Sequence, residues 1–310
     1  MEAMTPLEIR ALPNAGAEVF GVDVTTLTVG DWNQLQAAFA AYGLLVFRDQ
    51  ILTEEEHVEF ASRWGTVQEA SKDTSNPAKL SEQAGYWCAE SSYLSQPPLG
   101  SVEVVRRIPD DPTIRFASTY IAFDELASTT QRALEALTAT HSHLNETAEH
   151  PIVIHHPVSG RKAMFINPTF TTSVVDMEDE PGLALLNQLY EHILSERYIQ
   201  TVEWEVGTAI VSDSRPMLHF ARDFDDDGRT DKIMIEGTVL RPAVAPEKRD
   251  PAFAERAGAT LAGGILTAAM TGIAEVIDPE RKVHDIEIVA DAPDRQPLTG
   301  LDFGDLEPLD

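Results

Sequence analysis

Several features that mark other classes of protein are scarce in this sequence of 310 residues. It has one cysteine, Cys88, which excludes an internal disulfide framework and is typical of a reducing cytoplasm. No apolar run approaches the roughly 20 residues of a membrane-spanning helix, and the N-terminus lacks the charged and apolar regions of a signal peptide. We therefore expect a soluble, cytoplasmic protein.

Positive charge is also scarce. The chain has 23 Lys and Arg residues against 51 Asp and Glu residues, a formal net charge of −28. Nucleic acids and anionic membranes repel such a surface, so we expect neither as a partner. An acidic surface also simply keeps a protein dispersed. The expected partner is a small molecule, and a homo-oligomer is left open.

The distribution of apolar residues predicts a main domain over residues 1–242 that is mainly β, with helices packed outside it. Strands are predicted within 7–24 as a hairpin, and at 44–48, 101–108, 114–120, 202–206, 208–212 and 232–240. Helices are predicted at 31–42, 53–64, 129–140 and 181–195. Residues 243–310, rich in Ala and Gly and then in acidic residues, predict a helical extension followed by an acidic tail.

Cys88 and Glu90 stand in the sequence Trp87-Cys-Ala-Glu. If these four residues form a short strand, the period of two places the thiol and the carboxylate on one face. The pattern predicts a two-residue site, although free cysteine is also common as a small buried apolar residue.

Three further stretches follow this motif in the sequence. They are Gln96-Pro-Pro-Leu-Gly-Ser101, the sequence RFASTYIAFDEL from Arg115, and HPVSGRKAMFIN from His156. Together with Trp87 they resemble the TauD/TfdA family of iron(II) and 2-oxoglutarate dependent dioxygenases, over roughly residues 7–242. The resemblance implies a double-stranded β-helix, or jelly roll, and an oxidoreductase lineage.

The family holds its metal with a His and an Asp near this motif and with a distal His. This sequence has Cys88 and Glu90 at the first two positions and keeps only His219. If a metal is retained, these three are its expected ligands, with a thiolate that shifts preference toward softer metals. Without a metal, His219 with Cys88 and Glu90 makes a base, a nucleophile and an orienting carboxylate. A plain core histidine is the alternative for His219, and we favour the functional role because the family frame places it against Cys88 and Glu90.

Aligning the last strand with the family places Glu236 where the family has an Arg for 2-oxoglutarate. Just before Phe116, Ile114 stands where the family has a Thr that helps hold this cosubstrate. An anion in place of a cation repels a dicarboxylate. We therefore expect no cofactor and disfavour 2-oxoglutarate, with iron(II) or another divalent metal as the alternative. Glu236, Trp87 and Arg215 are the expected substrate-binding residues, and the expected substrate is neutral or cationic.

Three functions follow. The leading one is a small-molecule enzyme of specialised metabolism that has lost ordinary iron and 2-oxoglutarate chemistry and uses Cys88, Glu90 and His219 for acid-base or nucleophilic catalysis. The second is an atypical metal-dependent oxygenase with the same three residues. The third is a homologue without catalysis that binds a ligand or a partner.

The segment Asp223–Asp231 matches the first half of a calcium-binding loop, with oxygen ligands around Gly228. Met234 stands where the last ligand, a Glu, is expected. An ordinary hairpin turn explains Asp-Asp-Gly equally well and is the interpretation we favour.

Overall fold

The computed structural model describes residues 7–68, 86–108, 112–221, 230–237 and 240. All of them belong to one compact unit, residues 1–267. The predicted extension over 243–310 lies outside the described residues. So does the segment Asp223–Asp231, for which we favoured a hairpin turn over a calcium loop, apart from its end at Thr230 and Asp231.

The larger sheet has six strands in the order β1-β2-β3-β13-β5-β15. All neighbours pair antiparallel except β2 and β3, which are parallel. The strands are β1 (Glu8–Ala11), β2 (Ala17–Phe20), β3 (Leu44–Phe47), β13 (Ala209–Asp213), β5 (Gly100–Val105) and β15 (Thr230–Ile235). The predicted N-terminal hairpin is therefore present as β1 and β2.

A four-stranded sheet faces the larger one, in the order β12-β6-β14-β4. Its strands are β12 (Ile199–Glu203), β6 (Thr113–Ser118), β14 (Met217–Ala221) and β4 (Tyr86–Cys88). Buried apolar side chains from both sheets share one cluster, among them Leu44, Val46 and Ile210 from the larger sheet and Phe116, Val202 and Met217 from the smaller. The two sheets thus form a sandwich with an apolar interior.

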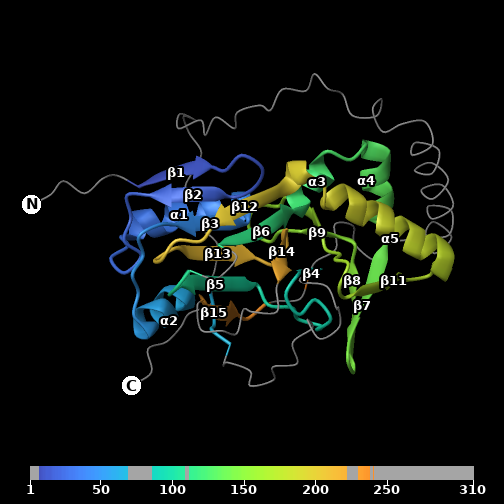
Figure 1. The fold of residues 1–310 in the computed structure, drawn as a ribbon. Coiled ribbons are helices and arrows are strands. Elements are labelled where there is room, and N and C mark those ends of the chain that lie inside the picture. The colour runs from blue at the N-terminus through green and yellow to red at the C-terminus, as the bar shows by residue number, and fades with distance from the viewer. Residues whose placement is uncertain (1–6, 69–85, 109–111, 222–229, 238–239, 241–310) are drawn as a thin grey trace, which may run out of the picture. The chain divides into compact units, whose positions relative to one another are not determined.

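Helices cover both outer faces. The first two, α1 (Val29–Tyr42) and α2 (Glu54–Ser62), pack on the larger sheet, where Leu35 and Phe60 join Val102 and Val104 of β5 in one core. Figure 1 shows α3 (Thr119–Asp124), α4 (Ser128–Leu134) and α5 (Asp179–Ile193) at the opposite end, and a 3-10 turn, Glu196–Tyr198, precedes β12.

Both N-terminal helices begin with a capping box. The predicted box of Thr53 and Glu56 is present in α2. For α1 the N-cap is Thr28, and Asp31, predicted to begin the helix, lies at the third helical position and binds back to Thr28. At the start of α1, Thr28 therefore takes the N-cap position and Asp31 takes the position three residues later.

A third sheet was not predicted from the sequence. It has the order β11-β7-β8, with β7 (Thr138–His143), β8 (Glu146–Pro151) and β11 (Thr171–Val174), and a separate pair joins β9 (Val153–His155) to β10 (Lys162–Met164). The predicted helix over 129–140 is wrong beyond Leu134. From Thr138 the side chains alternate between partly and fully buried, as a strand with two β-branched threonines requires.

Among the helices of the described ranges, none combines the length and the apolar character that crossing a membrane requires.

Candidate functional site

Cys88 and His219 lie directly opposite each other on neighbouring strands. The register pairs His219 of β14 with Cys88 of β4 on one side and with Phe116 of β6 on the other. Residues that are opposite in an antiparallel pair point to the same face, here the interior of the sandwich. The sulfur of Cys88 lies 3.8 Å from Nδ1 and 3.7 Å from Nε2 of His219, and both side chains are buried.

Glu90 reaches the same point from a turn. The predicted strand over Trp87–Glu90 is wrong beyond Cys88, because β4 ends there and Glu90 stands in a turn. Even so, its Oε1 lies 3.2 Å from Nε2 of His219. The structure therefore brings Cys88, Glu90 and His219 together, as the sequence predicts.

The opposite sheet adds two charged side chains that the sequence analysis missed. Glu103 of β5 pairs in register with Lys232 of β15, and Nζ of Lys232 lies 3.3 Å from Oε1 of Glu103. The same ammonium donates to Oε1 of Glu90. Because Val102 and Val104 face the helices, Glu103 between them faces the interior. A single Glu within the otherwise uncharged sequence of β5 was the sequence signal that could have identified Glu103 as a site residue.

The charges of this cluster perturb one another. Burial opposes ionisation of Glu90, but the ammonium of Lys232 and then His219 outweigh it and hold the pKa of Glu90 at about 2. Burial likewise opposes the charge on Lys232, yet Glu90 and Glu103 raise its pKa. Burial lowers the pKa of His219, as does Lys232, against the opposing effect of the two carboxylates. At neutral pH the cluster therefore contains two carboxylates, one ammonium and a neutral imidazole.

The cluster is accessible from solvent at its polar side chains. Lys232 and Glu90 are 27% and 24% exposed, whereas His219 is 11% exposed. The two charged groups are therefore more exposed to solvent than the imidazole.

The family implies a metal ion, and the arrangement here does not fit one. Within the described ranges, no set of three His, Cys, Asp or Glu side chains is arranged to hold a metal. The sulfur of Cys88 is almost equidistant from the two ring nitrogens of His219, so it lies along the lone pair of neither. Lys232 also donates to the Glu90 oxygen that faces His219.

The three expected substrate-binding residues lie elsewhere. Trp87 points to the opposite face of β4 from Cys88, against Phe220 at a ring distance of 5.3 Å. Arg215 is buried, and its guanidinium donates to Asp213 at 2.5 and 2.8 Å, so its charge is already used within the fold. Glu236 is exposed just beyond the end of β15.

Asp231 and His156 make contacts within the fold. Asp231, at the end of the segment weighed as a turn or a calcium loop, accepts a hydrogen bond from Nε of Arg106 at 2.7 Å. His156 is buried, and its Nε2 lies 3.0 Å from Oδ2 of Asp213.

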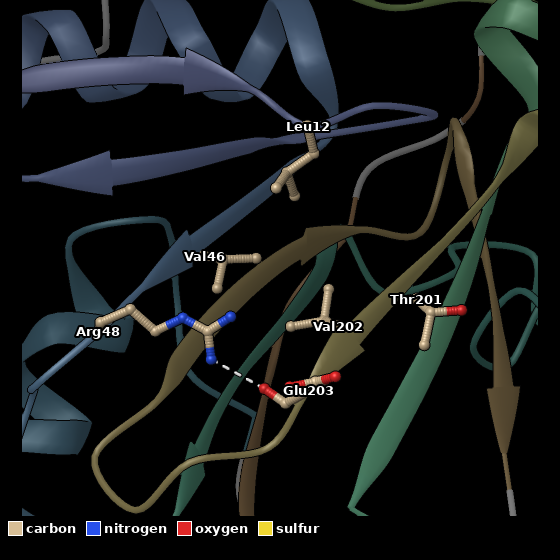
Figure 2. Close-up of a pocket in the computed structure, with 6 residues that line it drawn as sticks. All are labelled: Leu12, Val46, Arg48, Thr201, Val202 and Glu203. Atoms are coloured by element: carbon tan, nitrogen blue, oxygen red, sulfur yellow. Dashed lines mark hydrogen bonds between the residues drawn. The ribbon is translucent and has the colours of Figure 1, made fainter.

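A cavity of about 230 Å³ opens at the other edge of the sandwich, and Figure 2 shows its lining of Leu12, Val46, Arg48, Thr201, Val202 and Glu203. Its one cation, Arg48, already binds Glu18 at 2.7 Å and the carbonyl of Glu203 at 2.8 Å. It offers no cluster of reactive groups comparable to that around His219.

Comparison with known proteins decides the family. The model of the family "Taurine catabolism dioxygenase TauD, TfdA family" matches residues 8–235. This chain belongs to the TauD/TfdA family. The match covers both sheets of the sandwich and every residue of the cluster.

Similar proteins agree with this assignment. An (S)-phenoxypropionate/alpha-ketoglutarate-dioxygenase of Sphingobium herbicidovorans is 28% identical over 250 residues, covering 68% of this chain and 87% of that protein. An alpha-ketoglutarate-dependent sulfonate dioxygenase of Saccharomyces cerevisiae is 28% identical over 263 residues, covering 71% of this chain and 64% of its own length.

Solved structures confirm the predicted jelly roll. A taurine dioxygenase from Burkholderia xenovorans superimposes with a TM-score of 0.67 at 23% identity, covering 80% of this chain and 99% of that one. AAD-2, solved with Mn(II) and N-oxalylglycine, gives 0.65 at 22% identity, covering 77% and 100%. At these identities the likeness establishes the fold.

The prediction that this chain uses no cofactor and disfavours 2-oxoglutarate is overturned by these comparisons, because its relatives are named for alpha-ketoglutarate, which is 2-oxoglutarate. The prediction rested on Glu236 and Ile114, which stand where the family has an Arg and a Thr. The structure shows a different cation near His219, Lys232 of β15, which is paired with Glu90 and Glu103.

Replacing Glu90 by Gln is expected to flatten the acid limb of the stability curve. A carboxyl whose pKa falls from 4.5 to about 2 on folding stabilises the protein above pH 4.5, and this contribution is lost as the pH falls toward 2. Urea unfolding measured at several pH values should therefore show wild type losing more stability than Glu90→Gln across this window. Lys232→Met, which removes the main cause of the low pKa, should flatten the limb too. Parallel curves for wild type and Glu90→Gln would contradict the assigned contacts.

Proposed function

We propose that Cys88, Glu90, Glu103, His219 and Lys232, together the charged cluster, form the active site of a small-molecule enzyme of the TauD/TfdA family. The observation behind the proposal is the position of Lys232, whose ammonium lies between two carboxylates beside the imidazole of His219. A partly exposed cation beside a titratable base, at the open end of an apolar sandwich, is an arrangement suited to ligand binding.

Lys232 is proposed to pair with a carboxylate of alpha-ketoglutarate, the cosubstrate named for the relatives of this chain. Lys232 is partly exposed and stands against Glu90, whereas Arg215 is buried and bound to Asp213. A family metal, when bound, supplies oxygen chemistry. The arrangement here does not fit one, so the residues are assigned only binding and proton transfer.

The substrate is proposed to be neutral or to bear an ammonium group. Glu90 and Glu103 together have one more negative charge than Lys232 neutralises, since burial keeps His219 neutral. At an effective dielectric constant near 20, one charge at 4 Å is worth about 4 kcal/mol before desolvation is subtracted. Glu90 is the proposed counter-charge of the substrate, in place of the exposed Glu236.

The substrate and alpha-ketoglutarate are proposed to separate Glu90 from Lys232, each ligand pairing with one of these two side chains. A substrate ammonium that takes Glu90 releases one of the two contacts of Lys232, which is then free for the carboxylate of alpha-ketoglutarate. Each ligand thereby lowers the cost of binding the other, which is positive coupling.

His219, Glu90 and Cys88 are the residues proposed to take part in proton transfer. The neutral imidazole of His219 can accept a proton from substrate, and Glu90 at 3.2 Å stabilises the imidazolium that forms. A second candidate function keeps Cys88 as a nucleophile, because its sulfur is 3.7 Å from Nε2 of His219; the ring must turn to direct a lone pair at the thiol before it can take the proton.

The remaining sequence predictions complete the proposal. Residues 1–242 form the catalytic domain and residues 243–310 an appended extension. The single cysteine and the acidic composition support the proposal of a cytoplasmic enzyme without nucleic acid as a partner.

Isothermal titration of alpha-ketoglutarate tests the role of Lys232. Lys232→Met is expected to weaken binding about tenfold or more, because it removes a charge-assisted hydrogen bond worth roughly 1.5–3 kcal/mol. The matched control is Lys162→Met, whose ammonium pairs with Glu135 far along the chain from the cluster. Absence of binding to wild type, or equal affinity in Lys232→Met, would contradict the proposal.

Thermal shifts test the charge of the substrate. Primary amines, amides and carboxylic acids of matched carbon skeleton are compared on wild type and Glu90→Gln. Amines should raise the melting temperature of wild type in proportion to their occupancy and should lose this effect in Glu90→Gln. Amines that stabilise both proteins equally would exclude Glu90 as the counter-charge.

A further inference from the structure

The turn that contains Glu90 has little support from the strands. Strand β4 ends at Cys88, so Glu90 lies two residues beyond the last ladder hydrogen bonds. The next residue, Ser91, has φ of 46°, a left-handed conformation that side chains other than glycine seldom adopt. Such a conformation persists only where the surroundings enforce it.

Ser92 is the residue that the surroundings hold. Its Oγ accepts a hydrogen bond from Nδ2 of Asn167 at 2.9 Å and lies 3.0 Å from Nδ1 of His141. All three residues are fully buried. A buried hydroxyl with two buried polar partners has a fixed position, since leaving any of them unpaired is costly.

Further hydrogen bonds hold the backbone on both sides of Ser92. Thr169 Oγ1 donates to the carbonyl of Trp87 at 2.7 Å, and Nε2 of His150 donates to the carbonyl of Leu94 at 2.9 Å. His141 and His150 stand on β7 and β8, and Asn167 and Thr169 lie between β10 and β11. The third sheet and its connection are thus the platform on which the turn rests.

His141 is suited to a fixed structural contact rather than to proton transfer. Burial, and then His150, lower the pKa of His141 to about 3, so its ring stays neutral over the physiological range. Its ring stacks on Phe165 at a centroid distance of 5.5 Å. A neutral imidazole clamped in this way offers Ser92 the same hydrogen bond at any working pH.

We infer that Ser92, held by His141 and Asn167, is a positioning residue that sets the Glu90 carboxylate against His219 and Lys232. Fixing the residue two positions after Glu90 fixes the backbone of Ser91 in its unusual conformation, and with it the direction of the Glu90 side chain. The inference rests on the proposed function, because it treats Glu90 as part of the active site.

The test is the ring ¹H–¹⁵N correlation spectrum of His219 in ligand-free protein at one fixed pH, with His219→Asn for assignment. Glu90→Gln defines the spectrum in which the carboxylate is lost. Ser92→Ala is expected to move the His219 signals at least halfway toward that spectrum. Ser92→Thr, which keeps a hydroxyl, should restore them, and Ser92→Ala combined with Glu90→Gln should move them no further than Glu90→Gln alone.

The matched control is Ser142→Ala, which removes a hydroxyl of the same sheet that bonds to the carbonyl of Glu146 instead of the turn. It should leave the His219 signals unchanged. If Ser92→Ala yields too little folded protein, Asn167→Ser removes the donor to Ser92 and should give the same movement. Wild-type His219 signals in folded Ser92→Ala or Asn167→Ser would overturn the inference. Since no ligand is present, this result is independent of whether alpha-ketoglutarate binds.

Discussion

Two ion pairs of one ammonium hold the site together: Lys232 pairs with Glu103 of its own sheet and with Glu90 of the turn after β4. The interior between the sheets is otherwise lined by residues such as Val46, Phe116 and Ile210. Carboxylates at the end of such an interior need a cation close by, because losing their hydration is costly. The cation also sets the state of His219, whose pKa it lowers together with burial. The ionisation of the cluster, and therefore the ligands that it accepts, depends on these two ion pairs of Lys232.

The contacts of Lys232 depend on two different parts of the fold. Strand register places Lys232 opposite Glu103 and His219 opposite Cys88. Glu90 has no such ladder and depends on a turn that is anchored at Ser92 by the third sheet. The cluster thus combines two rigid strands with one anchored turn. A binding site on such a scaffold keeps its geometry without a ligand, which reduces the ordering cost of binding.

Local patterns in the sequence predicted what local interactions decide. The capping box at Thr53 and the N-terminal hairpin are of this kind. The shared position of Cys88, Glu90 and His219 was predicted from the family resemblance, because Cys88 and His219 are 131 residues apart. Lys232 was missed because its contact with Glu90 crosses between sheets, 142 residues apart in the chain. The third sheet was missed because the apolar pattern of α4 was extended from Leu134 to residue 140, which covers the start of β7 at Thr138. The expectation about 2-oxoglutarate was wrong because it rested on two aligned positions, Glu236 and Ile114, whereas the relatives that share the whole fold are named for alpha-ketoglutarate.

The most direct test of this account is a double-mutant cycle on Glu90 and Lys232. Urea unfolding at neutral pH would give the free energy of unfolding for wild type, Glu90→Gln, Lys232→Met and the double variant. Because the two side chains are in contact and only about a quarter exposed, the account predicts a coupling of roughly 0.5–3 kcal/mol, with the double variant less destabilised than the sum of the single variants. Additive effects of the two substitutions would contradict it.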